Sequence, residues 1–182
     1  MQLKRVTLGL AGAALLVAGS ALAQKVTTDY QKTVDFSRYK TYMWIMQPRA
    51  ANPLTRERII DDVNSALGRR GLTLVTGNAD VTIAAHAATR QERTLNTFYS
   101  GLGGGWRWGG LGSATTTVDT YEVGTLIVDV FDASTKEAIW RGVATKTLSD
   151  NPRKNADSLN KAIDKMFEKF PPQTAHETTR RD

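Results

Sequence analysis

Two stretches in the second half of the chain carry the strongest β-strand signal of the sequence, and they most constrain its fold. Residues 118–131 and residues 138–148 are rich in β-branched and aromatic side chains, and a polar segment, 132–136, separates them. This pattern predicts a β-hairpin with a polar turn. In the first stretch bulky apolar residues occupy both alternating sets of positions, which predicts a central strand covered on at least one side.

Two helices are expected, one before and one after this hairpin in the sequence. Each begins at an Asn-Pro pair, Asn52-Pro53 with Thr55 as a second possible cap, and Asn151-Pro152. Apolar residues then recur at helical spacing. The first stripe is Ile59, Ile60, Val63 and Leu67, and the second is Leu159, Ile163, Met166, Phe167 and Phe170. Glycines end the first helix and a Pro-Pro pair ends the second.

The rest of the chain completes a sheet. Strands are expected within residues 26–46, at 72–75 and at 79–88. Residues 89–96 are strongly polar, and the middle strand is expected to leave the sheet there, while residues 97–117 are predicted to form a long loop. The order is therefore ββα-ββ-loop-ββα. It predicts an α+β fold: a single domain with a mostly antiparallel sheet and two helices packed on one face.

The first residues have the features of an export signal. Lys4 and Arg5 precede an apolar run, 6–17, and Ala21-Leu22-Ala23 provides a small-residue cleavage site. We therefore expect residues 1–23 to be a signal peptide cleaved after Ala23, residues 24–172 to be the domain, and residues 173–182 to be a disordered tail. The expected location is the periplasm, and no further apolar run is long enough to span a membrane.

The amino-acid composition excludes several kinds of functional site. The chain has no cysteine, which removes disulfides, thiol nucleophiles and cysteine metal ligands. A bacterial lipoprotein needs cysteine at the cleavage point, where this chain has Gln24, so we expect a soluble protein that is not lipid-anchored. Lysine and arginine number 24 against 18 acidic residues; without the leader the formal charge is 22 − 18 = +4. This excess suits an anionic envelope surface, but no nucleic-acid-binding motif is present.

Several segments together resemble a bacterial envelope family described as domain of unknown function 4136. The opening segment from Asp35 to Trp44 matches that family's D-F-x-x-Y-K-T-Y-x-W pattern. Further matches are Asn52-Pro53-Leu54, Asp80-Val81 with His86, the stretch from Gly124 to Asp132, and Trp140-Arg141-Gly142. The resemblance covers nearly all of residues 26–170. It implies a secreted or lipid-anchored envelope protein with no established activity, and it transfers no catalytic residue.

The best candidate for a binding site is the predicted loop 97–117. Seven glycines lie between Gly101 and Gly112, and they surround two tryptophans with an arginine between them. Such side chains can stack on sugars, enter a lipid interface or bind a protein. The alternative is that the tryptophans fold back over an uncovered sheet face, or that the loop has no binding role. The predicted binding residues are Tyr99, Trp106, Arg107, Trp108, Arg90 and Arg93. The expected partner is an envelope protein, a glycan or an anionic lipid surface.

Catalysis is the alternative hypothesis. Glu92, Asp119 and Glu122 flank the loop and could serve a hydrolase acting on an envelope polymer, since glycosidases use two carboxylates at a fixed separation. His86 has no second histidine at a metal-binding spacing, so we expect a structural role, with no metal and no cofactor. No serine lies in a nucleophile-elbow motif. A non-enzymatic binding domain is the expected function, and self-association through the loop or a sheet edge is a third possibility.

Overall fold

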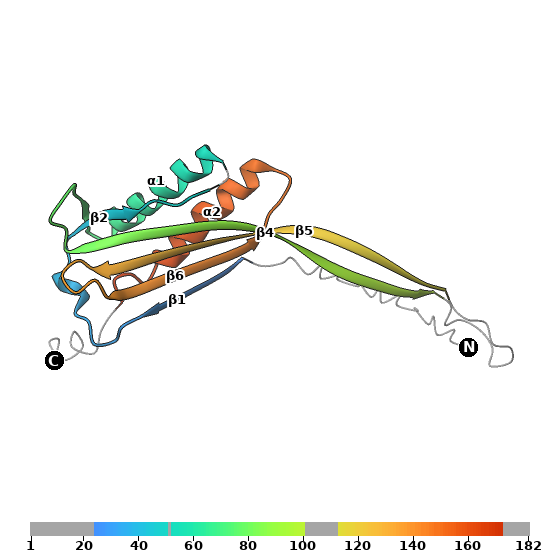
Figure 1. Cartoon of the computed structure of the whole chain (residues 1–182), viewed down its shortest axis with the longest axis horizontal. Helices are drawn as coiled ribbons and strands as arrows, with labels where there is room; N and C mark the ends of the chain where they lie inside the picture. Colours follow the sequence, from blue (N-terminus) through green and yellow to red (C-terminus); the bar gives the residue numbers. More distant parts are fainter. Residues whose placement is uncertain (1–23, 51, 101–112, 173–182) are drawn as a thin grey trace, which may run out of the picture.

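The computed structural model describes residues 24–50, 52–100 and 113–172, with only the backbone described at 96–100 and 113–115. One mixed sheet is covered on one face by two helices (Figure 1). The elements in chain order are β1 (Lys25–Tyr30), a 3-10 turn η1 (Phe36–Arg38), β2 (Thr41–Met46), α1 (Pro53–Arg69), β3 (Thr73–Leu74), β4 (Val81–Ser100), β5 (Ser113–Asp132), β6 (Ala138–Thr147) and α2 (Pro152–Phe167).

The sheet is antiparallel at its centre and parallel at one side. The spatial order is β1-β6-β5-β4-β2-β3, and the β5–β6 hairpin predicted from the sequence occupies the middle. Strand β2 is parallel to both β3 and β4, because helix α1 carries the chain back to the end where β2 began. The predicted α+β class, with two helices on one face of a mostly antiparallel sheet, is confirmed.

Both helices begin where their capping residues predict. The Asn52 side chain accepts a hydrogen bond from the Leu54 backbone N–H at 2.8 Å, and Asn151 accepts one from the Arg153 N–H at 2.9 Å. A proline follows each cap, where its missing N–H costs nothing. Gly71 ends the first helical segment with a φ of +84°, a conformation that favours glycine.

The core lies between the helices and the sheet. Trp140 of β6 stacks on Phe167 of α2 with ring centroids 5.0 Å apart, and Phe170 meets the edge of both rings. Helix α2 lies so close to β6 that a Cβ atom at Gly142 would sit 2.3 Å from Cγ of Met166. The buried apolar residues of the described core run from Phe36 to Phe170.

The predicted end of the middle strand near residue 88 is wrong, and the predicted loop 97–117 is wrong at 97–100 and at 113–117. Strands β4 and β5 pair without interruption from Val81 with Asp132 to Ser100 with Ser113. The error has a physical cause: this part of the hairpin is polar because neither of its faces is buried, and not because the chain turns. The rest of the predicted loop, residues 101–112, lies outside the described residues, as do the predicted signal peptide, 1–23, and the predicted tail, 173–182.

Candidate binding arm

The long β4–β5 hairpin leaves the body of the protein as a two-stranded ribbon (Figure 1). Strand β2 pairs with β4 only as far as Ala84, and β6 pairs with β5 only from Val123 onward. Beyond these points, residues 91–100 pair only with residues 113–122. We call these ten pairs the arm; at about 3.3 Å per residue they extend roughly 33 Å.

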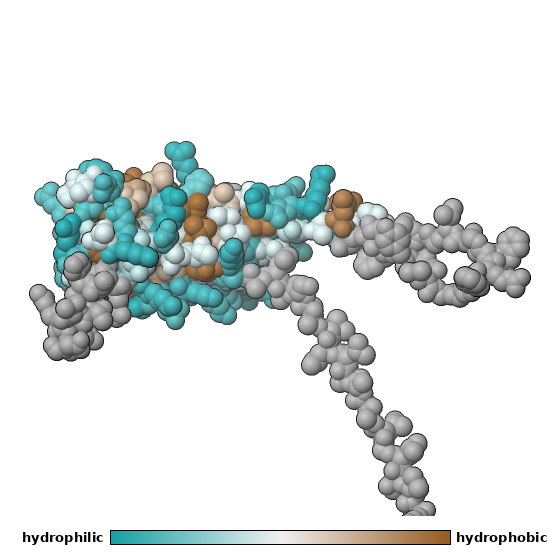
Figure 2. Space-filling model, turned by 90° about the horizontal axis from the view of Figure 1, so that it is seen from below, coloured by the Kyte–Doolittle hydropathy of each residue, from teal (hydrophilic) through white to brown (hydrophobic). Residues whose placement is uncertain are grey.

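One alternating set of arm residues belongs to the same set that faces the helices in the body, although the ribbon twists at its base so that β4 and β5 exchange places in Figure 1. In β4 the buried residues Val81, Ile83 and Ala85 face the helices, and the same alternating set reaches Leu95 in the arm. The register pairs Leu95 with Val118, which belongs to the corresponding set of β5. Within the described residues no helix covers this pair, and the two are 69% and 56% exposed. Figure 2 shows an apolar patch on the arm, among hydrophilic side chains.

The other face of the arm carries a polar network. The Tyr121 hydroxyl donates to Oε2 of Glu92 at 3.1 Å, and Thr94 lies 3.5 Å from the same hydroxyl. The Arg90 guanidinium, at the base of the arm, lies 2.5 Å from Oε1 of Glu92. These side chains hold the two strands together locally and are at least partly exposed to solvent, so each contributes modestly.

The structure separates the residues predicted to bind. Arg93 pairs with Thr120 and lies on the same face as Leu95, whereas Arg90 belongs to the opposite set. The backbone of Tyr99 pairs with Ala114 near the end of the arm, and its side chain is not described. Trp106, Arg107 and Trp108 lie outside the described residues. Their proposed role therefore stays a prediction.

Sequence reasoning missed Leu95 and Val118 as a pair. Each is a single large apolar residue inside a polar, threonine-rich stretch, which is the signal that could have identified it. The two are 23 positions apart, and only the strand register shows that they meet.

The carboxylates of the catalytic alternative are distributed over both faces. Glu92 pairs with Tyr121, while Glu122 pairs with Gln91, so alternation puts Glu92 and Glu122 on opposite faces of the ribbon. Asp119 shares the Glu92 face, and Glu92 is already bonded to Tyr121 and Arg90. His86 is exposed on the helix-free face of β4, opposite Ile127. Within the described residues, no three histidine, aspartate or glutamate side chains converge as a metal site would require.

The strongest polar cluster of the body lies at the other end of β5 and is structural. Asp132 is 3% exposed; its Oδ2 atom accepts from the Tyr39 hydroxyl at 2.7 Å and from Arg38 at 2.5 Å. Its Oδ1 atom accepts from the Ser134 hydroxyl at 2.5 Å and from the Thr135 N–H at 3.0 Å. These bonds attach η1 to the β5–β6 turn.

The same cluster shifts the pKa values of its members. Hydrogen bonds, first of all from Ser134, hold the pKa of the Asp132 carboxyl far below its usual range although burial opposes this. Burial and the bond to Asp132 raise the pKa of the Tyr39 hydroxyl to about 12. Asp132 is thus an ionised group that ties two distant segments together.

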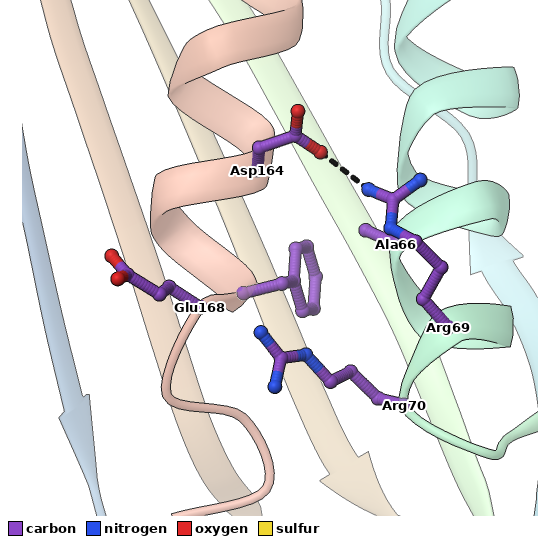
Figure 3. A pocket seen from close by; sticks show the side chains of 6 residues that line it. Ala66, Arg69, Arg70, Asp164 and Glu168 are labelled. Atoms are coloured by element: carbon purple, nitrogen blue, oxygen red, sulfur yellow. Dashed lines mark hydrogen bonds and ion pairs between the residues drawn. The ribbon is translucent and has the colours of Figure 1, made fainter.

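A shallow hollow of about 190 Å³ lies between the end of α1 and the end of α2 (Figure 3). Arg69 forms an ion pair with Asp164 across it, and Arg70 and Glu168 also line it. These opposite charges neutralise one another on an exposed surface, so the hollow has no selectivity for an anion or a cation. It lies at the end of the helices away from the arm. Neither helix in the described part is long and apolar enough to cross a membrane.

Comparison with solved structures shows the fold alone. A PDZ domain protein from Parabacteroides distasonis is 14% identical with a TM-score of 0.52; the match covers 83% of this chain and 37% of that one. This chain thus spans just over a third of that protein's length. A PelC dodecamer from Paraburkholderia phytofirmans is 13% identical with a TM-score of 0.49, over 79% of this chain and 94% of that one. Among curated proteins no sequence matches.

The sequence resemblance is confirmed by the family comparison. The model of the family described as Domain of unknown function (DUF4136) matches residues 26–172, which include every described strand and helix except the first residue of β1. The match includes the η1 segment and Asp132, whose bonds hold the body together, and both strands of the arm. The chain belongs to the DUF4136 family.

Proposed function

We propose that this protein is a non-enzymatic domain of the bacterial periplasm that binds another envelope component through its arm. The observation that carries the proposal is the arm itself. An isolated two-stranded hairpin is at best marginally stable in water, and this one exposes a paired leucine and valine. A ribbon that lies outside the core and exposes apolar side chains indicates a surface that binds another molecule.

The leader and the arm's composition support an envelope role. Residues 1–23 have the order of a secretory signal, and the Gly/Trp segment at the end of the arm has side chains common in binding surfaces. Export is tested by the mass of the protein recovered from the periplasm, which we expect to begin at Gln24. A mass that retains the leader would contradict the cleavage.

The proposal is tested by sedimentation with the cell envelope. The full chain is expressed in its own host, the cells are broken, and the fraction that pellets with the envelope is measured. We expect the double variant Leu95→Ser/Val118→Ser to associate about tenfold more weakly, because it removes two apolar contacts worth about 1 kcal/mol or more together.

The matched control is Leu74→Ser. Leu74 lies in β3, is also large, apolar and 48% exposed, but belongs to the body. It should sediment like the wild type. Equal losses in the arm variant and the control, or no association at all, would refute a binding role for the arm. Loss of a measurable hydrolytic activity in Glu92→Gln would favour the catalytic alternative.

A further inference from the structure

We propose that the fold keeps Gln24, the first residue of the mature chain, from cyclising to pyroglutamate. This inference rests on the cleavage after Ala23 that belongs to the proposed function, and it assigns a chemical state to the N-terminus that cleavage creates. The group that holds the glutamine open is the backbone carbonyl of Ser158 in α2.

An N-terminal glutamine carries both partners of an intramolecular reaction. Its α-amine nitrogen attacks Cδ of its own side-chain amide, so that a new C–N bond closes a five-membered ring. The bond between Cδ and Nε2 breaks, and Nε2 leaves as ammonia with the proton that the α-amine gives up. The reaction needs no oxidant and no cofactor, because the two groups belong to one residue. It does require the side chain to fold back onto the α-amine.

The Gln24 side chain instead reaches across to another element of the fold. Its Nε2 atom donates a hydrogen bond to the Ser158 carbonyl at 3.1 Å, between residues 134 positions apart. Gln24 is half-buried, and β1 begins at the next residue, where Lys25 pairs with Thr145. The leaving group of the cyclisation is therefore held by α2. Folding back for attack takes Nε2 away from this carbonyl, so the hydrogen bond must break first.

The acceptor is itself fixed in place. The Ser158 hydroxyl donates to the Lys154 carbonyl one turn earlier in α2 at 2.7 Å, and it accepts a hydrogen bond from Nζ of Lys146 in β6. Helix α2 also packs against both β1 and β6. The Ser158 carbonyl is thus positioned before Gln24 binds it, and the bond carries little additional ordering cost.

The open form keeps a positive charge beside the arm. Lys25 pairs with Thr145, and Thr147 pairs with Val123 at the base of the arm, so the mature N-terminus lies next to that base. The α-amine of an open N-terminus is largely protonated at neutral pH, since such groups titrate at about pH 8, whereas a pyroglutamate ring is neutral. The retained charge favours an anionic partner for the arm.

The inference is tested on purified mature protein, made with a removable fusion partner so that the chain begins at Gln24. The protein is incubated at about pH 8, where about half of an ordinary α-amine is unprotonated, and the loss of ammonia is followed by intact mass. We expect the folded protein to cyclise about fivefold more slowly than the same protein unfolded in guanidinium chloride, which is the factor that one net hydrogen bond supplies.

The matched control is an insertion of two glycines between Gln24 and Lys25. It leaves β1 and the N-terminal glutamine in place but moves the amide away from Ser158. Circular dichroism checks that this variant folds. Its folded and unfolded forms should cyclise at equal rates, and comparing each protein with its own unfolded form removes any effect of the residue that follows the glutamine.

Two results would overturn the inference: equal rates for folded and unfolded wild type, and protection that persists in the insertion variant, since it would not come from Ser158. The mass of the periplasmic protein separates this inference from the proposed function. A chain that begins at Gln24 but has lost ammonia would leave export standing and reject the protection. A chain that retains the leader would contradict the cleavage, while the rates of the purified protein still decide whether the fold protects Gln24.

Discussion

Strands β4 and β5 run through both the body and the arm, but their apolar side chains are buried in the body and exposed in the arm. In the body, Val128 and Val130 of β5 are fully buried beneath the helices. In the arm, Val118 of the same strand and the same alternating set is 56% exposed. The backbone pairing is continuous through both regions. Strand pairing alone therefore does not bury a side chain; the covering layer does, and it ends where α2 begins.

The largest expected effect is in the body's aromatic cluster. Trp140→Ala removes the ring that stacks on Phe167 and contacts Phe170, and we expect it to lower the free energy of unfolding by about 3–5 kcal/mol. Urea denaturation followed by circular dichroism measures the change. A loss below about 1 kcal/mol would mean that α2 does not depend on this packing.

A smaller loss is expected at the polar cluster. Asp132→Asn removes the charge that accepts bonds from Arg38 and Tyr39, and should cost about 2 kcal/mol at pH 7. Because the pKa of Asp132 is lowered by folding, its contribution is complete above the unfolded pKa, about 4, and declines as pH falls through the folded value.

The difference between wild type and Asp132→Asn should therefore shrink below about pH 4, measured as denaturation midpoints across pH. Asp129→Asn is the control, since its carboxylate pairs with Arg141 on the helix-free face and lies outside the cluster. A pH-independent difference would contradict the ionised state of Asp132.

One position in the body should gain stability. Asp62 of α1 has an oxygen, Oδ2, that is buried and has no hydrogen-bond partner among the described residues, and burial raises the pKa of this carboxyl. The ionised form is therefore costly above the raised pKa, so Asp62→Asn should add about 1 kcal/mol at pH 7 and little below pH 4. Thermal unfolding at both pH values checks this. If Asp62→Asn instead lost stability at pH 7, the negative charge of Asp62 would be stabilising the fold.

The smallest effect on folding should come from the arm. Leu95→Ser/Val118→Ser removes contacts with no covering layer, so the free energy of unfolding should change by less than about 0.5 kcal/mol. Amide hydrogens of the arm should also exchange faster than those of β5 between Val123 and Val130, which lie between two neighbouring strands. A large loss of stability would show that the arm belongs to the folded core.

The helices and the hairpin could be predicted from the sequence because their signals are local. The Asn-Pro caps mark where both helices begin, and the apolar stripes identify the faces that pack. The arm could not be predicted by the same reasoning. Its threonine-rich strands lack the apolar alternation of a half-buried strand, and a polar strand and a polar loop have similar composition.

The sequence by itself determined the fold class, the family and the order of elements, since these follow from periodicity, caps and motifs within short stretches. The tertiary structure decided which distant residues meet. It brought Asp132 to Tyr39, 93 positions earlier, and Leu95 to Val118. It also decided that the helix layer stops before the strands do. Such features depend on register and on where separate layers end, and neither is encoded in any one segment of the chain.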